Sequence, residues 1–490
     1  AGAIFWNGHN GTIRHSNFTN NMAKGIAWAI SVRGENNTGG DGGAVMWSGA
    51  LGEVIDCIFI NNTAAKRGGG VFLQAGILSN GTLENCSDTS FTDSRFENNI
   101  AGTNGGAIDW NEGAHKGMVN NVEFINNTAG RNGGAIFWHG DDGTVINSRF
   151  DNNRATGENR QYNMTVNMGT STIVETNGTK ILGNIIVIQS SQLPTDTPTS
   201  EDQNKLFVLN YTKDNMHVFE SYVVDNKTST LKWLKLDQTE VSADTISPVD
   251  WAIDQYFGGD GGTILWSGDI GYVYNCTFID SNSARRGGGA YMTGSDYVTY
   301  ESCTFYNCTS GTNGGGVDWL AGANYGKIYN CVFNQTRAAR SAGAIYYDGD
   351  YGRMENLTII NTRSYGGTLE HSTYGRNDVI YAKWDASHWD TNTTGGDAGA
   401  IMFTGSHEYV YNVTFLNCYS VGRGGAIFLQ GAHNVTIDDC NFTGNYARGI
   451  ANNTWKDYKS DRDDSNVNTT VNYDLTGHGG AIAFDVDASE

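Results

Sequence analysis

Residues 133–138 read Gly-Gly-Ala-Ile-Phe-Trp, and a close copy of Gly-Gly-Ala-Ile returns about a dozen times along the 490-residue chain. Where nothing intervenes, each copy follows the previous one by roughly two dozen residues, a period that is typical of solenoids and propellers. The last glycine before the Ala-Ile pair, or its equivalent, is Gly2, Gly43, Gly69, Gly106, Gly134, Gly262, Gly288, Gly315, Gly343, Gly399, Gly425 or Gly480.

A second motif, an aromatic residue followed by Asn, comes about fifteen to twenty residues after each copy. Examples are Phe124-Ile-Asn-Asn127 and Phe150-Asp-Asn-Asn153. Short alternating stretches bounded by Gly, Asn and Asp lie between the motifs and indicate strands joined by turns. A propeller blade needs about forty residues, so this smaller unit predicts one coil of a parallel β-helix, with two or three strands. The last Asn should point inward and hydrogen-bond the amides of the coils above and below.

The first strand of each unit shows which side chains face the core. Because side chains alternate along a strand, the residue after Gly-Ala and the residue two positions later share one face. The second of these columns is mostly aromatic, as at Trp110 and Trp138. Stacked coils would bury both columns between the sheets. The predicted core ladder is Ile4, Val45, Ile108, Ile136, Ile264, Val317, Ile345, Ile401 and Ile427.

The paired motifs Gly-Gly-Ala-Ile and Phe-x-x-Asn resemble the repeat of the polymorphic outer-membrane proteins and of the adhesin-like surface proteins of methanogenic archaea. The resemblance covers about three quarters of the chain. It implies an all-β, right-handed parallel β-helix in an extracellular protein of the cell surface, in an archaeal setting. The general preference for right-handed crossovers agrees with that handedness.

The residues that flank each copy of the motif follow four patterns, which recur in the same order along the chain. The coils are therefore predicted to form tandem modules of four coils each. Long insertions follow the fourth coil of a module, and the segment 154–257 is long enough to form a small inserted β-rich domain. The predicted division is coils in 1–153, the inserted domain in 154–257, coils in 258–364, an insertion loop in 365–394, coils in 395–447, an insertion loop in 448–477 and the start of a further coil in 478–490.

The amino-acid composition argues against some classes of partner for this chain, nucleic acid among them. The chain has 65 Gly, 3 Pro and a net charge of -21, with no basic cluster to bind phosphates. Nucleic acid is therefore not expected as a partner. No apolar run has the length of a membrane span, so no span is expected in this segment. The chain opens and closes inside a coil, and we expect it to be part of a longer or processed protein.

Asn-x-Ser/Thr sequons are more frequent than chance would supply, and several fall at positions predicted to face outward. Structural turn asparagines are the alternative interpretation, but the excess favours an extracellular glycoprotein. The predicted acceptors are Asn17, Asn61, Asn80, Asn126, Asn275, Asn307, Asn356, Asn412, Asn434 and Asn441.

No cluster of residues predicts catalysis, a metal or a cofactor. The eight cysteines mostly share the inward phase, which favours buried thiols that pack as small apolar groups. Asp109 and Asp318 stand on the outward phase but lie four coils apart, whereas glycoside hydrolysis needs two carboxylates close together. A polysaccharide-degrading β-helix enzyme is thus a remote alternative, and no catalytic or metal-binding residue is assigned.

The outward residue of the first strand is mostly apolar, which is unusual on a solvated solenoid. Two functions remain open: a surface adhesin that binds a partner or glycan through insert tips or this strip, and a structural subunit that assembles with other copies into a filament, sheath or coat. The insertions 22–38 and 154–257 could instead fold back over the strip. The residues predicted to bind a partner are Phe5, Phe72, Phe137, Tyr291, Tyr346 and Phe428.

Overall fold

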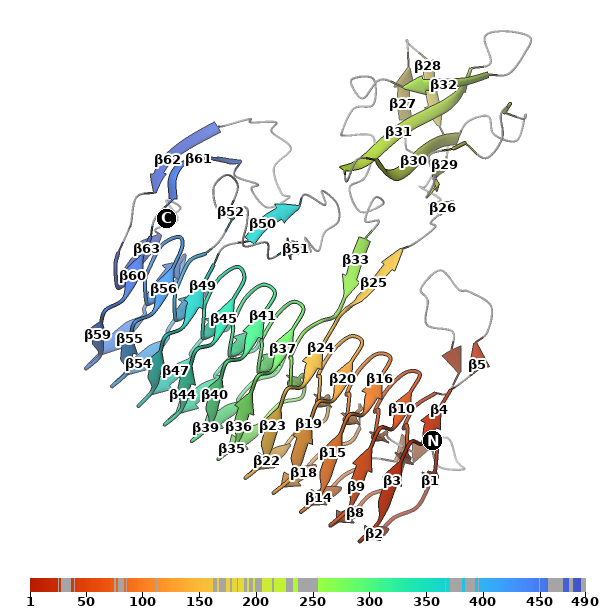
Figure 1. Cartoon of the computed structure of the whole chain (residues 1–490), viewed down its shortest axis with the longest axis vertical. Coiled ribbons are helices and arrows are strands. Elements are labelled where there is room, and N and C mark those ends of the chain that lie inside the picture. Colours follow the sequence, from red (N-terminus) through yellow and green to blue (C-terminus); the bar gives the residue numbers. More distant parts are fainter. Residues whose placement is uncertain are drawn as a thin grey trace.

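The computed structural model describes residues 1–24, 40–74, 86–111, 113–157, 258–365, 396–448 and 479–484, together with short strands and single residues between these ranges. The coils stack into a rod with the two termini at opposite ends of the stack (Figure 1). Within the described part of the chain there is no helix, and hence none that could cross a membrane.

Each coil contributes one strand to each of four parallel sheets, which we call sheets A, B, C and D in chain order. In the coil of residues 133–155 these strands are β21 (Ile136–Trp138), β22 (Thr144–Ile146), β23 (Arg149–Asp151) and β24 (Arg154–Ala155). The expectation of two or three strands per coil was too low. The sheet D strand has only two residues, too few to show alternation in the sequence.

Sheet A has twelve strands and runs the length of the rod, with every strand in register with its neighbours. Its strands are β1 (Ile4–Trp6), β7 (Val45–Trp47), β11 (Val71–Leu73), β17 (Ile108–Trp110), β21, β34 (Ile264–Trp266), β38 (Ala290–Met292), β42 (Val317–Trp319), β46 (Ile345–Tyr347), β53 (Ile401–Phe403), β57 (Ile427–Gln430) and β63 (Ile482–Asp485).

The two inward columns of sheet A lie in the core. Ile4, in the first coil, is half-buried, and the other eight members of the predicted core ladder have no measurable exposure. The rings of the second column stack along the rod, with centroids 4.2 Å apart for Trp110 and Trp138 and 4.7 Å apart for Trp138 and Trp266. The phenylalanines of sheet C form a parallel stack on the opposite wall, for example Phe96 and Phe124 at 5.2 Å.

The two glycines of the repeated motif are needed for different reasons. Gly105 has a φ of 62°, which side chains rarely adopt, and it turns the chain into the strand of sheet A. Gly106 has no such φ, but a Cβ on it would lie 2.0 Å from the carbonyl oxygen of Gly134 in the next coil. The coils approach so closely at this point that only glycine fits.

The tryptophans of sheet A are matched to a glycine at the start of sheet B. A Cβ on Gly143 would lie 2.3 Å from the Trp138 ring, and one on Gly271 would lie 2.5 Å from Trp266. Where sheet A carries Phe403 instead of Trp, Glu408 occupies the glycine's place and is buried. Burial, helped by the charge of Asp350, raises the pKa of Glu408 to about 8.

The inward asparagines form a continuous ladder through the N-terminal coils. The side-chain nitrogen of each donates to the amide oxygen of the next, at 2.9 to 3.0 Å, from Asn21 through Asn62, Asn99 and Asn127 to Asn153. Its second hydrogen reaches a backbone carbonyl, as from Asn99 to Phe59. Each buried amide is thereby satisfied, as the sequence predicted.

The corners on either side of sheet C also depend on asparagine. Asn147 and Asn152 have φ values of 52° and 50°, and residues at equivalent corners of other coils share this left-handed conformation. Asn adopts it more readily than other residues with a side chain. The aromatic-x-Asn-Asn motif therefore combines an inward ring, a corner residue and a ladder residue.

The insertions carry strands of their own. The segment 154–257 contains a five-stranded sheet in the order β26-β29-β30-β31-β32, and the ladder of β25 with β33 joins it to the coils (Figure 1). The bounds are β25 (Glu158–Gln161), β26 (Thr165–Val166), β29 (Asn184–Ile188), β30 (Lys205–Lys213), β31 (Met216–Asp225), β32 (Lys232–Leu236) and β33 (Asp254–Phe257). The sequence did not predict the hairpin of β12 (Gly76–Ile77) with β13 (Leu83–Glu84) inside the third coil.

Candidate partner-binding surface

The outward residues of sheet A are mostly covered, so the expected exposed strip is wrong for most of its members. Phe72 and Phe428 have no measurable exposure and Tyr291 is 2% exposed. Phe137 and Tyr346 are half-buried, and only Phe5, in the first coil, is 61% exposed. A surface made of these six residues could not contact a partner along the rod.

In three coils, the turn that precedes the sheet A strand covers the outward residue of that strand. The guanidinium carbon of Arg67 lies 4.2 Å from the ring centroid of Phe72, and Arg423 covers Phe428 at the same distance. Arg286 covers Tyr291 at 4.4 Å. In each of these three coils, the arginine four positions before the first residue of the sheet A strand thus covers the outward residue of that strand.

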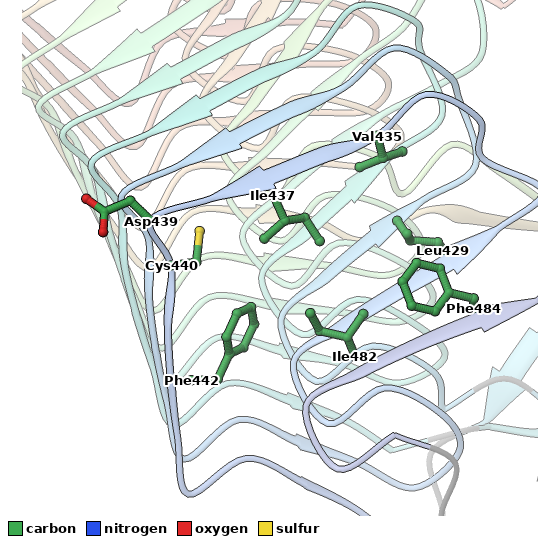
Figure 2. Close-up of a pocket in the computed structure, with 8 residues that line it drawn as sticks. All are labelled: Leu429, Val435, Ile437, Asp439, Cys440, Phe442, Ile482 and Phe484. Atoms are coloured by element: carbon green, nitrogen blue, oxygen red, sulfur yellow. The ribbon is translucent and has the colours of Figure 1, made fainter.

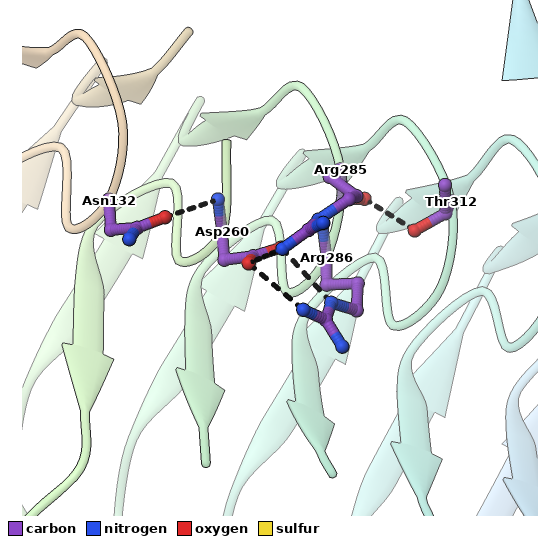
Figure 3. A network of polar contacts seen from close by, with 5 residues as sticks. All are labelled: Asn132, Asp260, Arg285, Arg286 and Thr312. Atoms are coloured by element: carbon purple, nitrogen blue, oxygen red, sulfur yellow. Dashed lines mark hydrogen bonds and ion pairs between the residues drawn. The ribbon is translucent and has the colours of Figure 1, made fainter. Parts of the chain in front are cut away.

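These turn residues also pair with one another along the rod. Both side-chain oxygens of Asp41 accept hydrogen bonds from Arg67, at 2.9 and 3.2 Å, and Asp397 accepts from Arg423 in the same way. Asp260 accepts from both Arg285 and Arg286, while its backbone amide donates to Asn132 (Figure 3). Burial opposes the charge of Asp260, but the two arginines outweigh it and lower its pKa.

Two carboxyl groups beside this network have no partner. Asp109 and Asp318 replace the outward aromatic in the third coil of each module and have no measurable exposure. Neither side-chain oxygen of either residue has a hydrogen bond within the described residues, and the amide oxygens of Asn104 and Asn313, in the turns over them, also lack one. Burial raises the pKa of both carboxyls well above the usual value, although nearby arginines oppose the shift. They are consequently too enclosed to act on a substrate.

We expect Asp109→Asn and Asp318→Asn to stabilise the protein at pH 7, each by about 1–3 kcal/mol, because a neutral amide removes a buried carboxyl group whose charged form is penalised by burial. An aspartate whose folded pKa is raised binds more protons folded than unfolded, so the parent should lose stability as pH rises from about 4 towards the folded pKa. Urea midpoints measured between pH 4 and 8 should show this loss in the parent and a smaller one in the double variant. A higher urea midpoint for the parent than for the double variant at pH 7 would contradict the assignment of Asp109 and Asp318 as buried carboxyl groups without partners.

The exposed aromatic surface lies elsewhere, on the corner between sheets A and B. Tyr297, Tyr325, Tyr351 and His407 come from four successive coils, and their ring centroids are 4.8, 5.1 and 4.7 Å apart. The three tyrosines are 50%, 36% and 45% exposed. Their faces stack on one another, so the row presents ring edges and hydroxyl groups to solvent.

A second row holds these rings in place. The backbone amide of each residue before a ring donates to the side chain of its equivalent in the previous coil: Asp296 to Asp269, Asn324 to Asp296 and Asp350 to Asn324, at 2.8 to 2.9 Å. Ser406 donates to Asp350 in turn. The corner is therefore fixed by hydrogen bonds between coils, and the aromatic row is rigid before any partner arrives.

Sheet B extends the aromatic surface beyond the corner. Tyr272 and Tyr274 lie side by side on its outer face with centroids 6.0 Å apart, and Tyr409 and Tyr411 form an equivalent pair at 6.1 Å. The hydroxyl of Tyr272 donates to Glu301 at 2.9 Å, and burial together with this carboxylate raises its pKa to about 12. We call the set Tyr272, Tyr274, Tyr297, Tyr325, Tyr351, His407, Tyr409 and Tyr411 the tyrosine face.

The sequence analysis did not predict the tyrosine face, although the distribution of tyrosine along the chain is uneven. Residues 1–153 contain no tyrosine, whereas 258–364, a copy of the same module, contain eleven. The corner positions in the first module are instead Leu51, Asp88, Lys116 and Asp142. Of the eleven tyrosines, Tyr291, Tyr300 and Tyr347 are buried, so the two modules differ in tyrosine content at buried as well as exposed positions.

The predicted glycosylation sites lie mostly on the surface. Asn307 is half-buried and Asn80 lies outside the described residues; the other eight predicted acceptors are exposed. Several of the exposed amides bond the equivalent residue of the previous coil, as Asn412 does to Asn356 at 2.8 Å and Asn275 to Asn147. One hydrogen of each such nitrogen is thereby engaged.

Two other features were considered as sites. A hollow of about 550 Å³ at the last described coil is lined by Leu429, Ile437, Phe442, Ile482 and Phe484, which continue the core columns (Figure 2). Its lining belongs to the core at the last described coil. Among the described residues, no group of three or more His, Cys, Asp or Glu side chains could hold a metal ion, and the eight cysteines are free thiols.

The repeat and the fold match known families. A model of the right-handed β-helix region matches residues 262–465. A model of the Chlamydia polymorphic membrane protein repeat matches residues 56–74, 93–109 and 121–137. The chain therefore carries polymorphic-membrane-protein-type repeats on a right-handed parallel β-helix, as its sequence predicted. Repeats of this kind indicate a protein associated with the cell surface or outer membrane.

Solved structures with a similar fold are distant. A mannuronic acid-specific polysaccharide family 6 lyase from human gut microbiota is 10% identical over 90% of this chain and 78% of that chain, with a TM-score of 0.29. PfbA, a surface adhesin of Streptococcus pneumoniae, is 12% identical over 90% of this chain and 92% of that chain, with a TM-score of 0.30. Comparison with curated protein sequences gives no match.

Proposed function

We propose that this chain, with its polymorphic-membrane-protein-type repeats on a right-handed β-helix, is the extracellular, glycosylated rod of a surface adhesin that binds its partner through the tyrosine face. The rod is rigid and repetitive, and its partner is another surface molecule, a protein or a glycan. The protein is not an enzyme in this proposal, which agrees with the burial of Asp109 and Asp318, the carboxylates considered for catalysis.

The tyrosine face is the observation that carries the proposal. Tyrosine supplies a large contact area with a polar tip and loses little conformational entropy, so it is enriched where proteins bind partners. Here the rings are already immobilised by stacking and by the hydrogen bonds of the neighbouring row. A partner would therefore bind a preorganised surface, which reduces the entropy lost on binding.

Replacing Tyr297, Tyr325 and Tyr351 together by Asn tests the proposal without straining the fold, because Asn10 and Asn434 hold the same corner with positive φ. Displayed on cells that lack other adhesins and N-linked glycosylation, so that the sequon created by Tyr297→Asn stays unmodified, the parent chain should mediate attachment to a panel of target cells. The triple variant should lose at least about tenfold of this attachment, the effect of one or two binding hot spots.

The matched control replaces Leu51, Asp88 and Lys116 by Asn at the same corner of the first module, and it should attach like the parent. Circular dichroism spectra of all three proteins should agree. Equal attachment by the parent and the tyrosine variant would refute the role of the tyrosine face.

The alternative is a structural subunit whose copies pack side by side into a filament, sheath or coat. The same observation favours it, because a straight row of ring edges repeated at each coil also suits a second rod. Sedimentation velocity and electron microscopy of the parent and of the tyrosine variant separate the two functions. Assembly that the variant abolishes would favour the subunit, and a monomeric parent that still attaches to cells would favour the adhesin.

Glycosylation is expected at Asn17, Asn275, Asn412 and Asn441, which combine a sequon with an exposed position on the rod. A glycan on Asn275 or Asn412 leaves one hydrogen on the amide nitrogen, so the bond to the previous coil can persist. Mass spectrometry of intact glycopeptides from native protein should find these four sites modified. Uniformly unmodified asparagines at all four would exclude this part of the proposal.

A further inference from the structure

A polar groove crosses four successive coils at the corner of sheets C and D, away from the tyrosine face. It has a volume of about 440 Å³ and is lined by Asn152, Arg154, Asp280, Asn282, Asn307, Thr309 and Arg337. This volume lies in the range of ordinary ligand clefts, but the lining is polar throughout. Such a lining suits a ligand rich in hydroxyl groups.

The two arginines lie at opposite ends of the groove. Arg154, Asn282, Thr309 and Arg337 are aligned in register on consecutive strands of sheet D, so three coil rises, about 14 Å, separate the arginines. They are too far apart to converge on one anion. A linear chain with acidic groups at intervals and hydroxyl groups between them would match both.

The remaining side chains are arranged for such a ligand. The guanidinium of Arg154 donates twice to Asn152, at 3.2 and 2.9 Å, which fixes its orientation. Within the described residues, no hydrogen bond or ion pair engages the guanidinium of exposed Arg337. Between the two, Asn282 donates to Thr309 and Asn307 donates to Asp280, leaving further donor and acceptor sites open on these amides and hydroxyl.

Charge supports an acidic ligand. The chain carries a net charge of -21, yet the two arginines outnumber the single carboxylate in this lining. Arg363 follows Arg337 in the same column one coil further on, but it does not line the groove. Guanidinium groups bind carboxylates in a bidentate manner, which adds geometric specificity to the attraction.

We propose that this groove binds a short stretch of an acidic polysaccharide, with Arg154 and Arg337 on acidic groups of the chain and Asn282 and Thr309 on hydroxyl groups between them. The site is separate from the tyrosine face, and it does not depend on the adhesin proposal. A glycan on Asn307 would occupy the groove, so the half-buried Asn307 is the least suitable of the described acceptor asparagines.

The test uses the full chain, produced without glycosylation, and titration calorimetry with an oligogalacturonate hexasaccharide. We expect binding that weakens with added salt, about tenfold weaker binding in Arg337→Gln and in Arg154→Gln, and parental binding in Arg363→Gln, whose arginine shares the column but does not line the groove. A κ-carrageenan hexasaccharide, which carries sulfate groups and no carboxylate, distinguishes sulfate from carboxylate as the acidic group.

Three results would overturn the proposal: no binding of either acidic hexasaccharide at millimolar concentration, equal binding of the carboxyl-reduced neutral hexasaccharide, or equal affinity of Arg337→Gln and the parent. Loss of binding in Arg363→Gln as large as in Arg337→Gln would also contradict it, because the attraction would then be a property of the whole arginine column.

Discussion

Asn99→Leu should destabilise the protein by roughly 2–6 kcal/mol, although both side chains branch at Cγ. Asn99 accepts from the backbone and side-chain nitrogens of Asn62 and donates to Phe59 and Asn127, at 2.9 to 3.0 Å. Leucine would leave the backbone N–H of Asn62 and one hydrogen of its side-chain amide buried without partners. Each such group costs about 1–3 kcal/mol.

The urea midpoint, followed by tryptophan fluorescence, measures this loss, and Thr336→Val is its matched control. Thr336 occupies the ladder position in the second module, and its hydroxyl is buried without a partner. Valine has the same shape without the hydroxyl, so this variant should keep or raise the midpoint. An equal loss of urea midpoint in Asn99→Leu and Thr336→Val would mean that the ladder position tolerates no substitution, whether or not its side chain is hydrogen-bonded.

Gly106→Ala should cost more than about 4 kcal/mol or prevent folding, which is exceptional for a single methyl group. The added carbon would lie 2.0 Å from the carbonyl oxygen of Gly134 and 2.7 Å from the backbone of Thr128. The coils must then separate by about 1 Å to reach an ordinary contact. That movement breaks the backbone bonds from Gly106 to Gly133 and from Ala107 to Ala135, at 3.1 and 2.9 Å.

Gly480→Ala provides the control, since Gly480 is the equivalent motif residue in the last described coil. Among the described residues, a Cβ there would meet only the carbonyl oxygen of Asn445, at 3.7 Å, which is an ordinary contact. Yield of soluble protein and thermal melting should therefore change greatly in Gly106→Ala and little in Gly480→Ala. A Gly106→Ala protein that melts like the parent would show that the motif glycines serve only as turns.

The sequence by itself determined the stacking of the coils. Copies of Gly-Gly-Ala-Ile align the strands of sheet A, and the alternation around Ile136 and Trp138 identifies the inward face. Asn127 and Asn153 could be placed in an inward ladder because a buried amide must find partners, and its equivalents one coil away are the nearest. These features follow from a fixed period, which a linear sequence displays directly.

Only the tertiary structure decided what covers each outward side chain. Strand alternation places Phe72 on the outer face of sheet A, but the turn at Arg67 folds back over that face and buries it. The match of Trp138 with Gly143 likewise depends on contact across a corner, which has no period of its own. The tyrosine face could not be predicted from the sequence for the same reason. Tyr297, Tyr325 and Tyr351 lie at irregular corners, and only the stacking of the coils brings their rings together.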